Sequence, residues 1–332
     1  MLYSILSDSG VKVSKITIGT ALFGIAPDEV EAAALIDLAL RHGINFIDTA
    51  NSYGNQLRFD RDEGTSWRDR RSAEEIVGEV IASRREQVVL ATKVSEQVGE
   101  GPNDGGFEGG GLSRLHIMRQ IEASLSRLQV DYIDIYYAHH PDPLTNIEET
   151  LRAFADLIRQ GMIRYYALST YDGWQVAEFI ATADRLGLPR PVCHQTRYSL
   201  AKRWVEAEVL PANRHFGLST TAFSPLAGGL LTGRDHEAGP RGDARWGGKG
   251  FVASELQLQA RFADLADAWG LPAPQLALAW VLAQPGLSSV IVGPENAEQL
   301  ERLIPAIDLK LTVDQLDELE SVSPPPCDLW NQ

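Results

Sequence analysis

The sequence predicts an α/β protein, a (β/α)8 TIM barrel, on three observations. Eight short apolar runs alternate with helical patterns along nearly all of the 332 residues. The runs lack strict alternation of apolar and polar residues, which is typical of parallel strands that are buried on both faces. No Gly-x-Gly-x-x-Gly motif opens the first helix, so the signature of the competing doubly wound open sheet is missing. We therefore expect one barrel domain over residues 1–332.

The expected strands are short, and in a barrel their carboxyl ends meet at the face that carries the chemistry. They span residues 16–19, 44–50, 87–94, 132–139, 163–169, 191–198, 218–223 and 288–293.

The helical patterns between these runs carry apolar stripes with a period of 3.6 residues. Ser72 with Glu75 forms a capping box, and Thr145 with Glu148 is expected to start a helix that ends at Gly161. The expected helices are 28–42, 72–83, 113–128, 145–161, 173–186, 202–213, 273–284 and 296–303. Extra helices at 254–269 and 312–322, and an N-terminal β-hairpin from 2–6 and 11–15, lie outside the alternation.

Composition excludes several classes of function. The formal charge is −15, from 45 acidic and 30 basic residues, so the chain is expected to bind neither nucleic acid nor a membrane surface. Its two cysteines are far apart in the sequence, which disfavours a disulfide framework. No apolar segment is long enough to span a membrane and no signal peptide is visible, so a cytoplasmic location is expected.

Two ionisable side chains stand at neighbouring strand ends. By the period of two, Asp48 shares a strand face with Phe46, and Lys93 shares one with Ala91. A carboxylate among apolar neighbours is costly unless it meets a cation, so we expect Asp48 and Lys93 to pair. From strand position alone, a structural ion pair and a functional one are both open.

A phenol and two histidines are candidates to join this pair. Tyr53 lies in the loop after Asp48, and His139 and His140 end the fourth strand, where periodicity cannot choose between them. No third ligand stands at a recognisable metal spacing, so no metal is expected. A cation beside the phenol would lower the tyrosine pKa from about 10, and a histidine would stabilise an oxyanion. Such a group suits proton delivery to a carbonyl oxygen while hydride reaches its carbon.

These residues stand in motifs that resemble the catalytic tetrad motifs of the aldo-keto reductase superfamily. The motifs are Asp48-Thr49-Ala50 with Tyr53-Gly54, Ala91-Thr92-Lys93, and His139-x-Pro141-Asp142. The resemblance covers nearly the whole chain. Gly111-Leu112-Ser113-Arg114 and Asp131-Tyr132-Ile133-Asp134 are similar to the bacterial and sugar-ketone branches of the family.

The resemblance implies a role for each matched residue. Tyr53 would donate the proton, Lys93 and Asp48 would lower its pKa, and His139 rather than His140 would orient the carbonyl. The resemblance also implies a cofactor-binding set, in which Ser169 and Gln195 hold the nicotinamide carboxamide and Phe223 stacks on the ring. The rest of that set is Gly19, Thr20, Ser224, Leu226 and Gly228, with Gly293, Glu295, Asn296 and Gln299 at the adenosine end.

The choice between the two nicotinamide cofactors is where the sequence departs from the family. Glu295 stands where a basic or hydroxyl side chain commonly receives the 2′-phosphate of NADP, and Arg302 stands one helical turn away. A carboxylate repels a phosphate and can bind a ribose hydroxyl instead. NADP(H) is preferred over NAD(H) because it is usual in the family, and both stay open.

Two long polar loops attach beside the catalytic candidates and are expected to contact substrate. Residues 55–71 carry Trp67 and Arg68, and residues 95–111 are rich in glycine; His140 is a further substrate candidate. The sequence thus predicts an NAD(P)(H)-dependent oxidoreductase that reversibly reduces an aldehyde or ketone, with a sugar-like carbonyl preferred. The alternatives are a Schiff-base aldolase that uses Lys93 and a cofactor-binding regulatory subunit. A monomer and a homo-oligomer both stay open.

Overall fold

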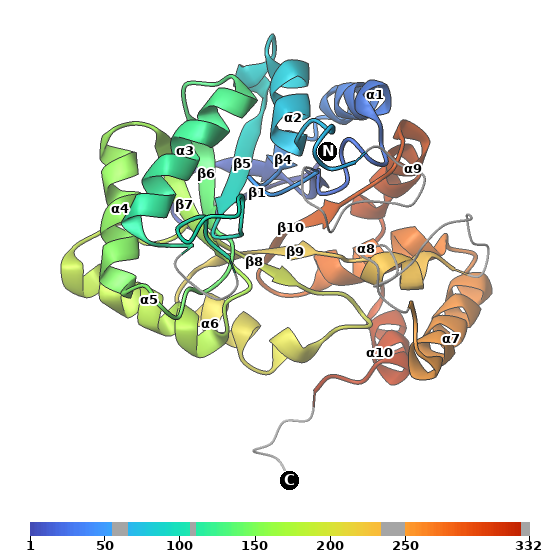
Figure 1. Ribbon diagram of the computed structural model, residues 1–332. Coiled ribbons are helices and arrows are strands. Elements are labelled where there is room, and N and C mark those ends of the chain that lie inside the picture. The colour runs from blue at the N-terminus through green and yellow to red at the C-terminus, as the bar shows by residue number, and fades with distance from the viewer. Residues whose placement is uncertain (55–65, 107–110, 234–249, 327–332) are drawn as a thin grey trace.

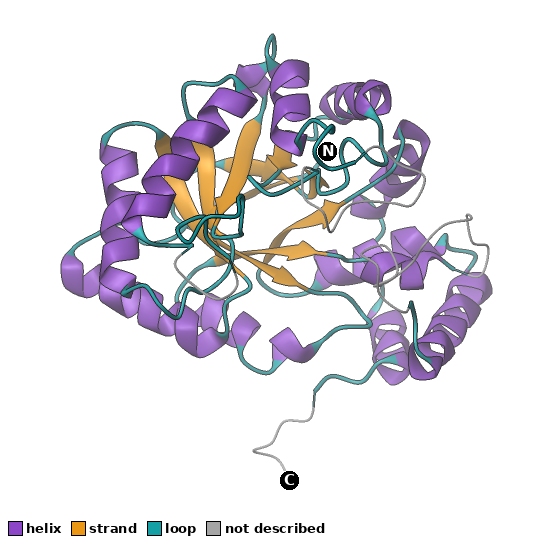
Figure 2. Ribbon diagram, viewed as in Figure 1, coloured by secondary structure: helices purple, strands orange, loops and turns teal. Residues whose placement is uncertain are grey.

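Eight parallel strands form a closed barrel surrounded by helices in the computed structural model, which describes residues 1–54, 66–106, 111–233 and 250–326. Figures 1 and 2 show the strands at the centre and the helices around them. The barrel runs in the order β10-β3-β4-β5-β6-β7-β8-β9, and β9 pairs with β10 to close it. The predicted (β/α)8 fold is confirmed.

The barrel strands lie close to the predicted runs. The largest difference is at the run 44–50, of which only Phe46–Asp48 is a strand, and the turn that follows begins at Asn51. The strands are β3 (Ile16–Gly19), β4 (Phe46–Asp48), β5 (Val89–Val94), β6 (Ile133–Ala138), β7 (Ile163–Ser169), β8 (Cys193–Arg197), β9 (Ser219–Phe223) and β10 (Leu287–Val292).

Most helices also match their patterns, and the predicted capping box of Ser72 with Glu75 is present. The α-helices are α1 (Glu29–Arg41), α2 (Ala73–Ile81), α3 (Arg114–Leu128), α4 (Ile147–Arg159), α5 (Gly173–Leu186), α6 (Val209–His215), α7 (Ala253–Trp269), α8 (Ala273–Ala283), α9 (Ala297–Leu303) and α10 (Val313–Val322).

Two helix predictions are wrong in detail. Asn146, not Thr145, caps α4, because its side chain accepts from the amide of Glu148, while the Thr145 hydroxyl donates to Asp142. The helix expected over 202–213 is a 3-10 turn at Trp204–Glu206 followed by the short α6. Pro211 explains the late start of α6, since proline fits only the first turn of a helix.

The expected N-terminal hairpin, β1 (Tyr3–Ile5) with β2 (Lys12–Ser14), lies against the barrel. Buried Leu6 and Val13 belong to the apolar cluster that fills the barrel interior with Phe46, Ala91 and Tyr137. A second, larger apolar cluster lies between the strands and the helices. The interior is therefore packed, and polar side chains at the carboxyl ends of the strands stand above an apolar floor.

Among the described residues, no helix is both long and apolar enough to cross a membrane.

Candidate active site

The expected ion pair is present at the ends of β4 and β5. Lys93 Nζ donates to Asp48 Oδ2 over 2.5 Å and to the carbonyl of Thr49 over 2.9 Å. Asp48 lies opposite Ala91 in the strand register, and Lys93 is two residues after Ala91. The side chains of Asp48 and Lys93 therefore project on the same inner face. Both are buried, Lys93 completely. A buried ammonium is held this way only when its hydrogen bonds are made, and here they are.

The loop after β4 returns the phenol of Tyr53 to this pair. Lys93 Nζ lies 3.3 Å from the Tyr53 hydroxyl and 4.8 Å from the centre of its ring. The Tyr53 amide donates to Ala50, and the Tyr53 carbonyl accepts from Ala73, the first residue of α2. Gly54 follows with a φ of +84°, which favours glycine. The helix therefore anchors the turn that presents the phenol.

The direction of the Tyr53 pKa corrects the expectation from sequence. Burial raises the pKa of Tyr53, the ammonium of Lys93 lowers it, and Asp48 and Glu96 raise it, so the net pKa lies above the ordinary value. A simple cation-phenol argument neglects the burial and the two carboxylates. Burial lowers the pKa of Lys93, but Asp48 and Tyr53 raise it by more, so the ammonium is retained. Tyr53 is thus a protonated acid at neutral pH.

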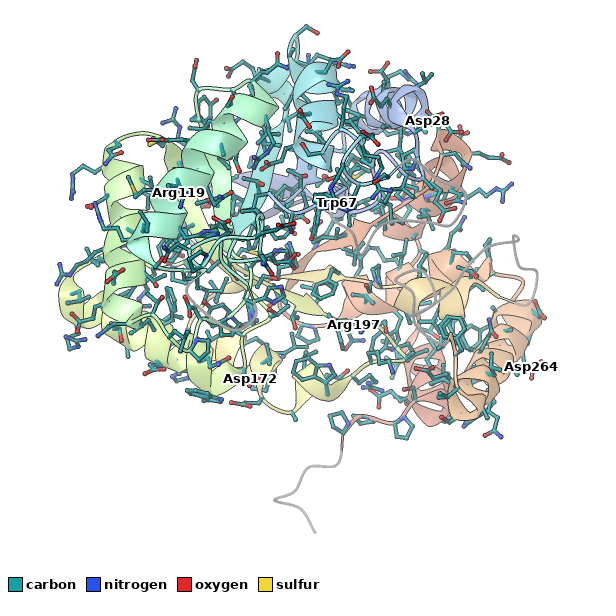
Figure 3. The ribbon with its side chains drawn as sticks, viewed as in Figure 1. Asp28, Trp67, Arg119, Asp172, Arg197 and Asp264 are labelled. Atoms are coloured by element: carbon teal, nitrogen blue, oxygen red, sulfur yellow. The ribbon has the colours of Figure 1, made fainter. Side chains whose placement is uncertain are left out.

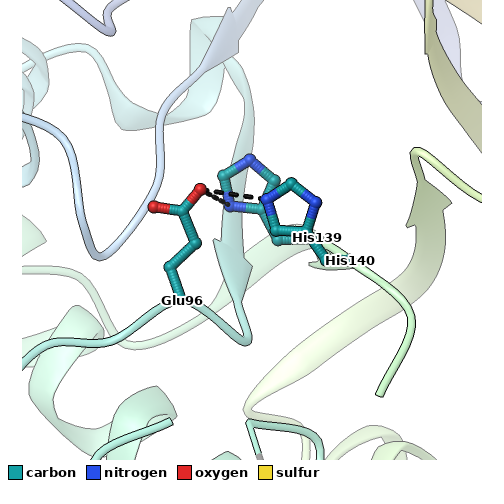
Figure 4. Close-up of side chains that lie close together, drawn as sticks. All are labelled: Glu96, His139 and His140. Atoms are coloured by element: carbon teal, nitrogen blue, oxygen red, sulfur yellow. Dashed lines mark hydrogen bonds and ion pairs between the residues drawn. The ribbon is translucent and has the colours of Figure 1, made fainter. Parts of the chain in front are cut away.

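His139 and His140 meet a carboxylate that the sequence reasoning missed. Figure 4 shows Glu96 facing both rings. Its Oε1 lies 3.0 Å from Nε2 of His140 and 3.7 Å from Nδ1 of His139, and its Oε2 accepts from Ser52 over 2.7 Å. The Tyr53 ring meets the His139 ring edge-on, with 5.8 Å between centroids. The only sequence signal for Glu96 was its place three residues after Lys93.

The same three side chains hold potential metal-ligand atoms within 4.8 Å of one another, but they are not arranged around an ion. The two histidine rings are stacked, with 4.5 Å between centroids and 13° between planes. A metal lies in the plane of each imidazole it binds, at about 2.1 Å from the nitrogen. No point meets that condition for two stacked rings. The cluster has the geometry of a hydrogen-bond network.

The residues expected at the nicotinamide end come together beside this group. Ser169 and Gln195 are register partners on β7 and β8, and both are buried. Gln195 Nε2 donates to Asp48 Oδ1 over 2.8 Å, a contact that the sequence did not predict. Phe223 ends β9, half-buried, with a face that can stack on a ring.

The segment after Phe223 suits a phosphate. Positive φ angles occur at Ser224, Ala227, Gly228 and Gly229, so the chain turns tightly after β9, and the amides of Ala227 and Gly229 donate to the carbonyls of Ser224 and Leu226 within this turn. Glycine at two of these positions lets a ligand approach the backbone closely. The turn can therefore receive a phosphate next to a ring stacked on Phe223.

Other residues expected to bind cofactor have structural roles in this fold. A side chain on Gly19 would meet Ile291 at 2.7 Å, so β3 and β10 can pack only with glycine there. The Thr20 hydroxyl donates to the Asp48 carbonyl over 3.1 Å.

At the adenosine end, side chains hold the loop that follows Gly293. Gln299 accepts from the amide of Glu295 over 2.9 Å, and Asn296 caps α9 by accepting from the amide of Gln299 over 2.8 Å. Arg302 pairs with Glu298 one turn away.

The expected substrate loops are described only in part. Arg68 stacks over the Trp67 ring at 4.5 Å, and Arg70 donates to the Gly54 carbonyl over 2.8 Å, beside Tyr53. In Figure 3, Trp67 and Arg197 lie nearer the centre of the view than Asp28 and Asp264 on the surrounding helices. Residues 55–65 and 107–110 of these loops lie outside the described residues.

Comparison with known proteins shows the family of the chain. The profile of the Aldo/keto reductase family matches residues 15–324. The chain belongs to this family. It is 40% identical over 331 residues to a protein of Bacillus subtilis (strain 168) named uncharacterized oxidoreductase YrpG, covering 98% of this chain and 97% of that one. It is therefore an oxidoreductase of the aldo/keto reductase family.

Two plant relatives carry a different name. Proteins described as probable voltage-gated potassium channel subunit beta are 36% identical in Arabidopsis thaliana and 35% in Oryza sativa subsp. japonica. Each alignment runs over 337 residues and covers 97% of this chain and 96% of the relative.

The contacts of Lys93 argue against the Schiff-base aldolase alternative. A Schiff base requires a neutral lysine amine. Lys93 instead remains an ammonium, because it donates to Asp48 and Thr49 and lies against the Tyr53 hydroxyl.

Proposed function

We propose that this aldo/keto reductase reversibly reduces an aldehyde or ketone to an alcohol with a nicotinamide cofactor, and that Tyr53 donates the proton. The observation that carries the proposal is the Tyr53 hydroxyl 3.3 Å from the buried ammonium of Lys93, which Asp48 holds over 2.5 Å. This places an acid and a fixed positive charge together at the opening of the barrel, where oxygen anions can be stabilised.

The chain's own groups have separable tasks in this reaction. Tyr53 gives its proton to the carbonyl oxygen in reduction and takes it back in oxidation. Lys93 stabilises the phenolate that forms, and Asp48 keeps Lys93 charged and in place. His139, edge-on to the Tyr53 ring, orients the carbonyl oxygen. A bound nicotinamide supplies the hydride.

The cofactor would be held by the residues that the fold brings together. Ser169 and Gln195 would bind the carboxamide, Phe223 would stack on the ring, and the turn over residues 224–229 would bind the pyrophosphate. NADP(H) is the preferred cofactor, because it is usual in the family. NAD(H) is the competing one, because the carboxylate of Glu295 has the wrong charge for binding a 2′-phosphate.

A polar, sugar-like carbonyl is the preferred substrate class. The buried side chains next to Tyr53 at the strand ends are polar, namely Ser52, Glu96 and His139. Polar surroundings of this kind disfavour an apolar substrate body, which would separate these groups from water without offering them hydrogen bonds.

Binding and turnover test the proposal together. Fluorescence titration with NADPH and NADH should show binding, and a screen of sugar-like, aliphatic and aromatic carbonyls with the tighter cofactor should show reduction. Tyr53→Phe keeps the ring and removes the acid, so its turnover should fall by about 10²–10⁴ with cofactor affinity little changed. Turnover that survives this change would remove Tyr53 from the proposed mechanism.

A regulatory role is the second candidate, and the two plant relatives named as channel subunits favour it. In that case the protein would bind cofactor and turn over no carbonyl in the screen. Reduction above the background of the Tyr53→Phe variant would decide for the enzyme.

A further inference from the structure

Glu96 joins four consecutive strand ends at the opening of the barrel. It follows β5 and is 5% exposed. Its carboxylate accepts from Ser52 in the loop after β4 and meets His140 after β6. His140 in turn meets Thr170 after β7, with Nδ1 2.8 Å from the hydroxyl. A chain of hydrogen bonds therefore runs Ser52–Glu96–His140–Thr170 round the rim.

One proton of this chain can be assigned from its acceptor. Nε2 of His140 lies 3.0 Å from Oε1 of Glu96, and a carboxylate accepts but has no proton to give. Nε2 therefore carries a proton and donates it to Glu96.

The second ring nitrogen of His140 meets Thr170. The Thr170 hydroxyl lies 2.8 Å from Nδ1, 2.9 Å from the His139 carbonyl and 2.7 Å from the Ser169 carbonyl. Both ring nitrogens of His140 are thus held by the protein, and Glu96 is the partner that fixes the proton on Nε2.

This pair lies against both groups that would face a carbonyl. The same Oε1 is 3.7 Å from Nδ1 of His139, whose ring is stacked on the His140 ring. On the other side, the carboxylate holds Ser52, which precedes Tyr53 in the chain. His140 uses both nitrogens within the chain of hydrogen bonds, so it has no donor left for substrate, which revises its expected role.

We propose that Glu96 is a positioning residue of this site, whose carboxylate accepts from Nε2 of His140 and fixes His139 and the Tyr53 turn where they face the carbonyl. The proposal rests on the proposed carbonyl reduction. It adds that a negative charge beside the tetrad is part of the machinery.

The charge of Glu96 also has a measurable electrostatic effect. Burial raises the pKa of Tyr53 and Lys93 lowers it, while Asp48 and Glu96 each raise it. His139 and His140 are the other titratable groups that face this carboxylate. Glu96→Gln keeps the size and can still bond Ser52 and His140, but it removes one charge that raises the Tyr53 pKa. The alkaline limb of the reductive pH profile should therefore move to lower pH.

The first test reads the protons directly and needs neither cofactor nor substrate. The whole protein labelled with ¹⁵N-histidine should show a proton on Nε2 of His140, with the signal assigned by its loss in His140→Gln. In Glu96→Gln, whose amide can donate to Nε2 while its oxygen accepts from Ser52, the proton should move to Nδ1. A bare Nε2 at His140 in the unmodified protein would overturn the proposal, whether or not carbonyl reduction is found.

The second test is kinetic and has a matched control. Glu96→Gln should lower kcat about tenfold with KM changed less than about twofold, which is the pattern of a lost transition-state contact. Glu96→Asp, which keeps the charge, should keep the alkaline limb near its original pH.

Glu74→Gln is the control: Glu74 is another buried carboxylate, bonded to Thr92 and Arg127 on the outer side of the barrel wall. It should cost stability and leave the pH profile unchanged. An alkaline limb unmoved in Glu96→Gln would show that the residue is only structural.

Discussion

The side-chain amide of Gln195 donates to Oδ1 of Asp48 over 2.8 Å, and Lys93 donates to Oδ2 of the same carboxylate. A buried carboxylate thereby has both oxygens satisfied, from strands on either side of the barrel opening. Gln195 is therefore already oriented without any cofactor, with its carbonyl oxygen as the group that can accept from a carboxamide. The proposed cofactor contact and the catalytic ion pair are joined through one side chain.

This contact predicts a stability loss that is independent of cofactor. Gln195→Leu leaves one oxygen of a buried carboxylate without its donor, which should lower the free energy of unfolding by about 1–3 kcal/mol. Urea denaturation of the cofactor-free protein measures it. Ser169→Ala is the control, since the Ser169 hydroxyl has no hydrogen-bond partner in the described part of the chain, and it should cost far less. Equal losses in the two variants would mean that the Gln195 contact contributes nothing.

The ion pair itself should behave as one unit. Asp48→Asn leaves a buried ammonium without its counter-charge, a loss typically of about 3–5 kcal/mol. The double variant, Asp48→Asn with Lys93→Met, should lose much less unfolding free energy and kcat/KM than the sum of the losses in the two single variants. Additive losses in kcat/KM would show that the pair acts outside the chemistry.

Lys93→Met alone should also move the alkaline limb of the reductive profile to higher pH. The reason is that the ammonium lowers the pKa of Tyr53 against burial and the two carboxylates. This direction is opposite to that expected for Glu96→Gln, so the two variants check each other.

The sequence could predict the parts of the site that strands carry. Asp48 and Lys93 follow from the period of two, because Lys93 lies two residues after Ala91, the register partner of Asp48, and so projects on the same face. Tyr53 and His139 followed from a family resemblance, since a loop has no period that fixes where its side chains point. Glu96 lies in such a loop, and no sequence pattern indicated that it would reach the site.

Quantities that depend on burial were equally out of reach. The sequence showed a lysine that could approach Tyr53, but it did not show how deeply the phenol is buried. Because of that burial the pKa of Tyr53 is raised, whereas the lysine alone would have lowered it. Thr145 and Asn146 are both good helix caps, so only the competing bond from Thr145 to Asp142 decided which residue begins α4.

A buried histidine makes the fold sensitive to acid. Burial lowers the pKa of His194 to about 4, and its Nδ1 donates to Asn213 while Nε2 accepts from the Tyr171 amide. The unfolded chain binds a proton below about pH 6.5, and the folded one only near pH 4. Stability should therefore fall as pH drops from about 6.5 to about 4, by up to about 3 kcal/mol. Urea midpoints across this range, compared with those of His194→Gln, measure the effect; parallel curves would assign the acid sensitivity to other groups.

We expect cofactor choice to depend on a charge in the loop after the last strand. Glu295 is partly buried, its amide is held by Gln299, and the resemblance to the family motif aligns it with the residue that receives a 2′-phosphate. A close charge pair near a surface is worth about 1–4 kcal/mol, and solvent keeps it toward the lower end. Glu295→Arg should move the NADPH/NADH ratio of kcat/KM toward NADPH by roughly tenfold, since about 1.4 kcal/mol is tenfold. The shift should shrink as salt rises, because exposed charges are screened.

Arg302 provides the matched control for this change. Its guanidinium pairs with Glu298 on the exposed face of α9, so it must leave that partner to bind a phosphate. If the pair persists with cofactor bound, Arg302→Ala should leave the NADPH/NADH ratio unchanged, and Glu295 alone sets the preference. If kcat/KM fell with NADPH and stayed the same with NADH, the phosphate would instead be assigned to Arg302. An unchanged ratio in both variants would mean that neither side chain reaches the 2′ position, and that the loop after β10 aligns differently with the family than we have placed it.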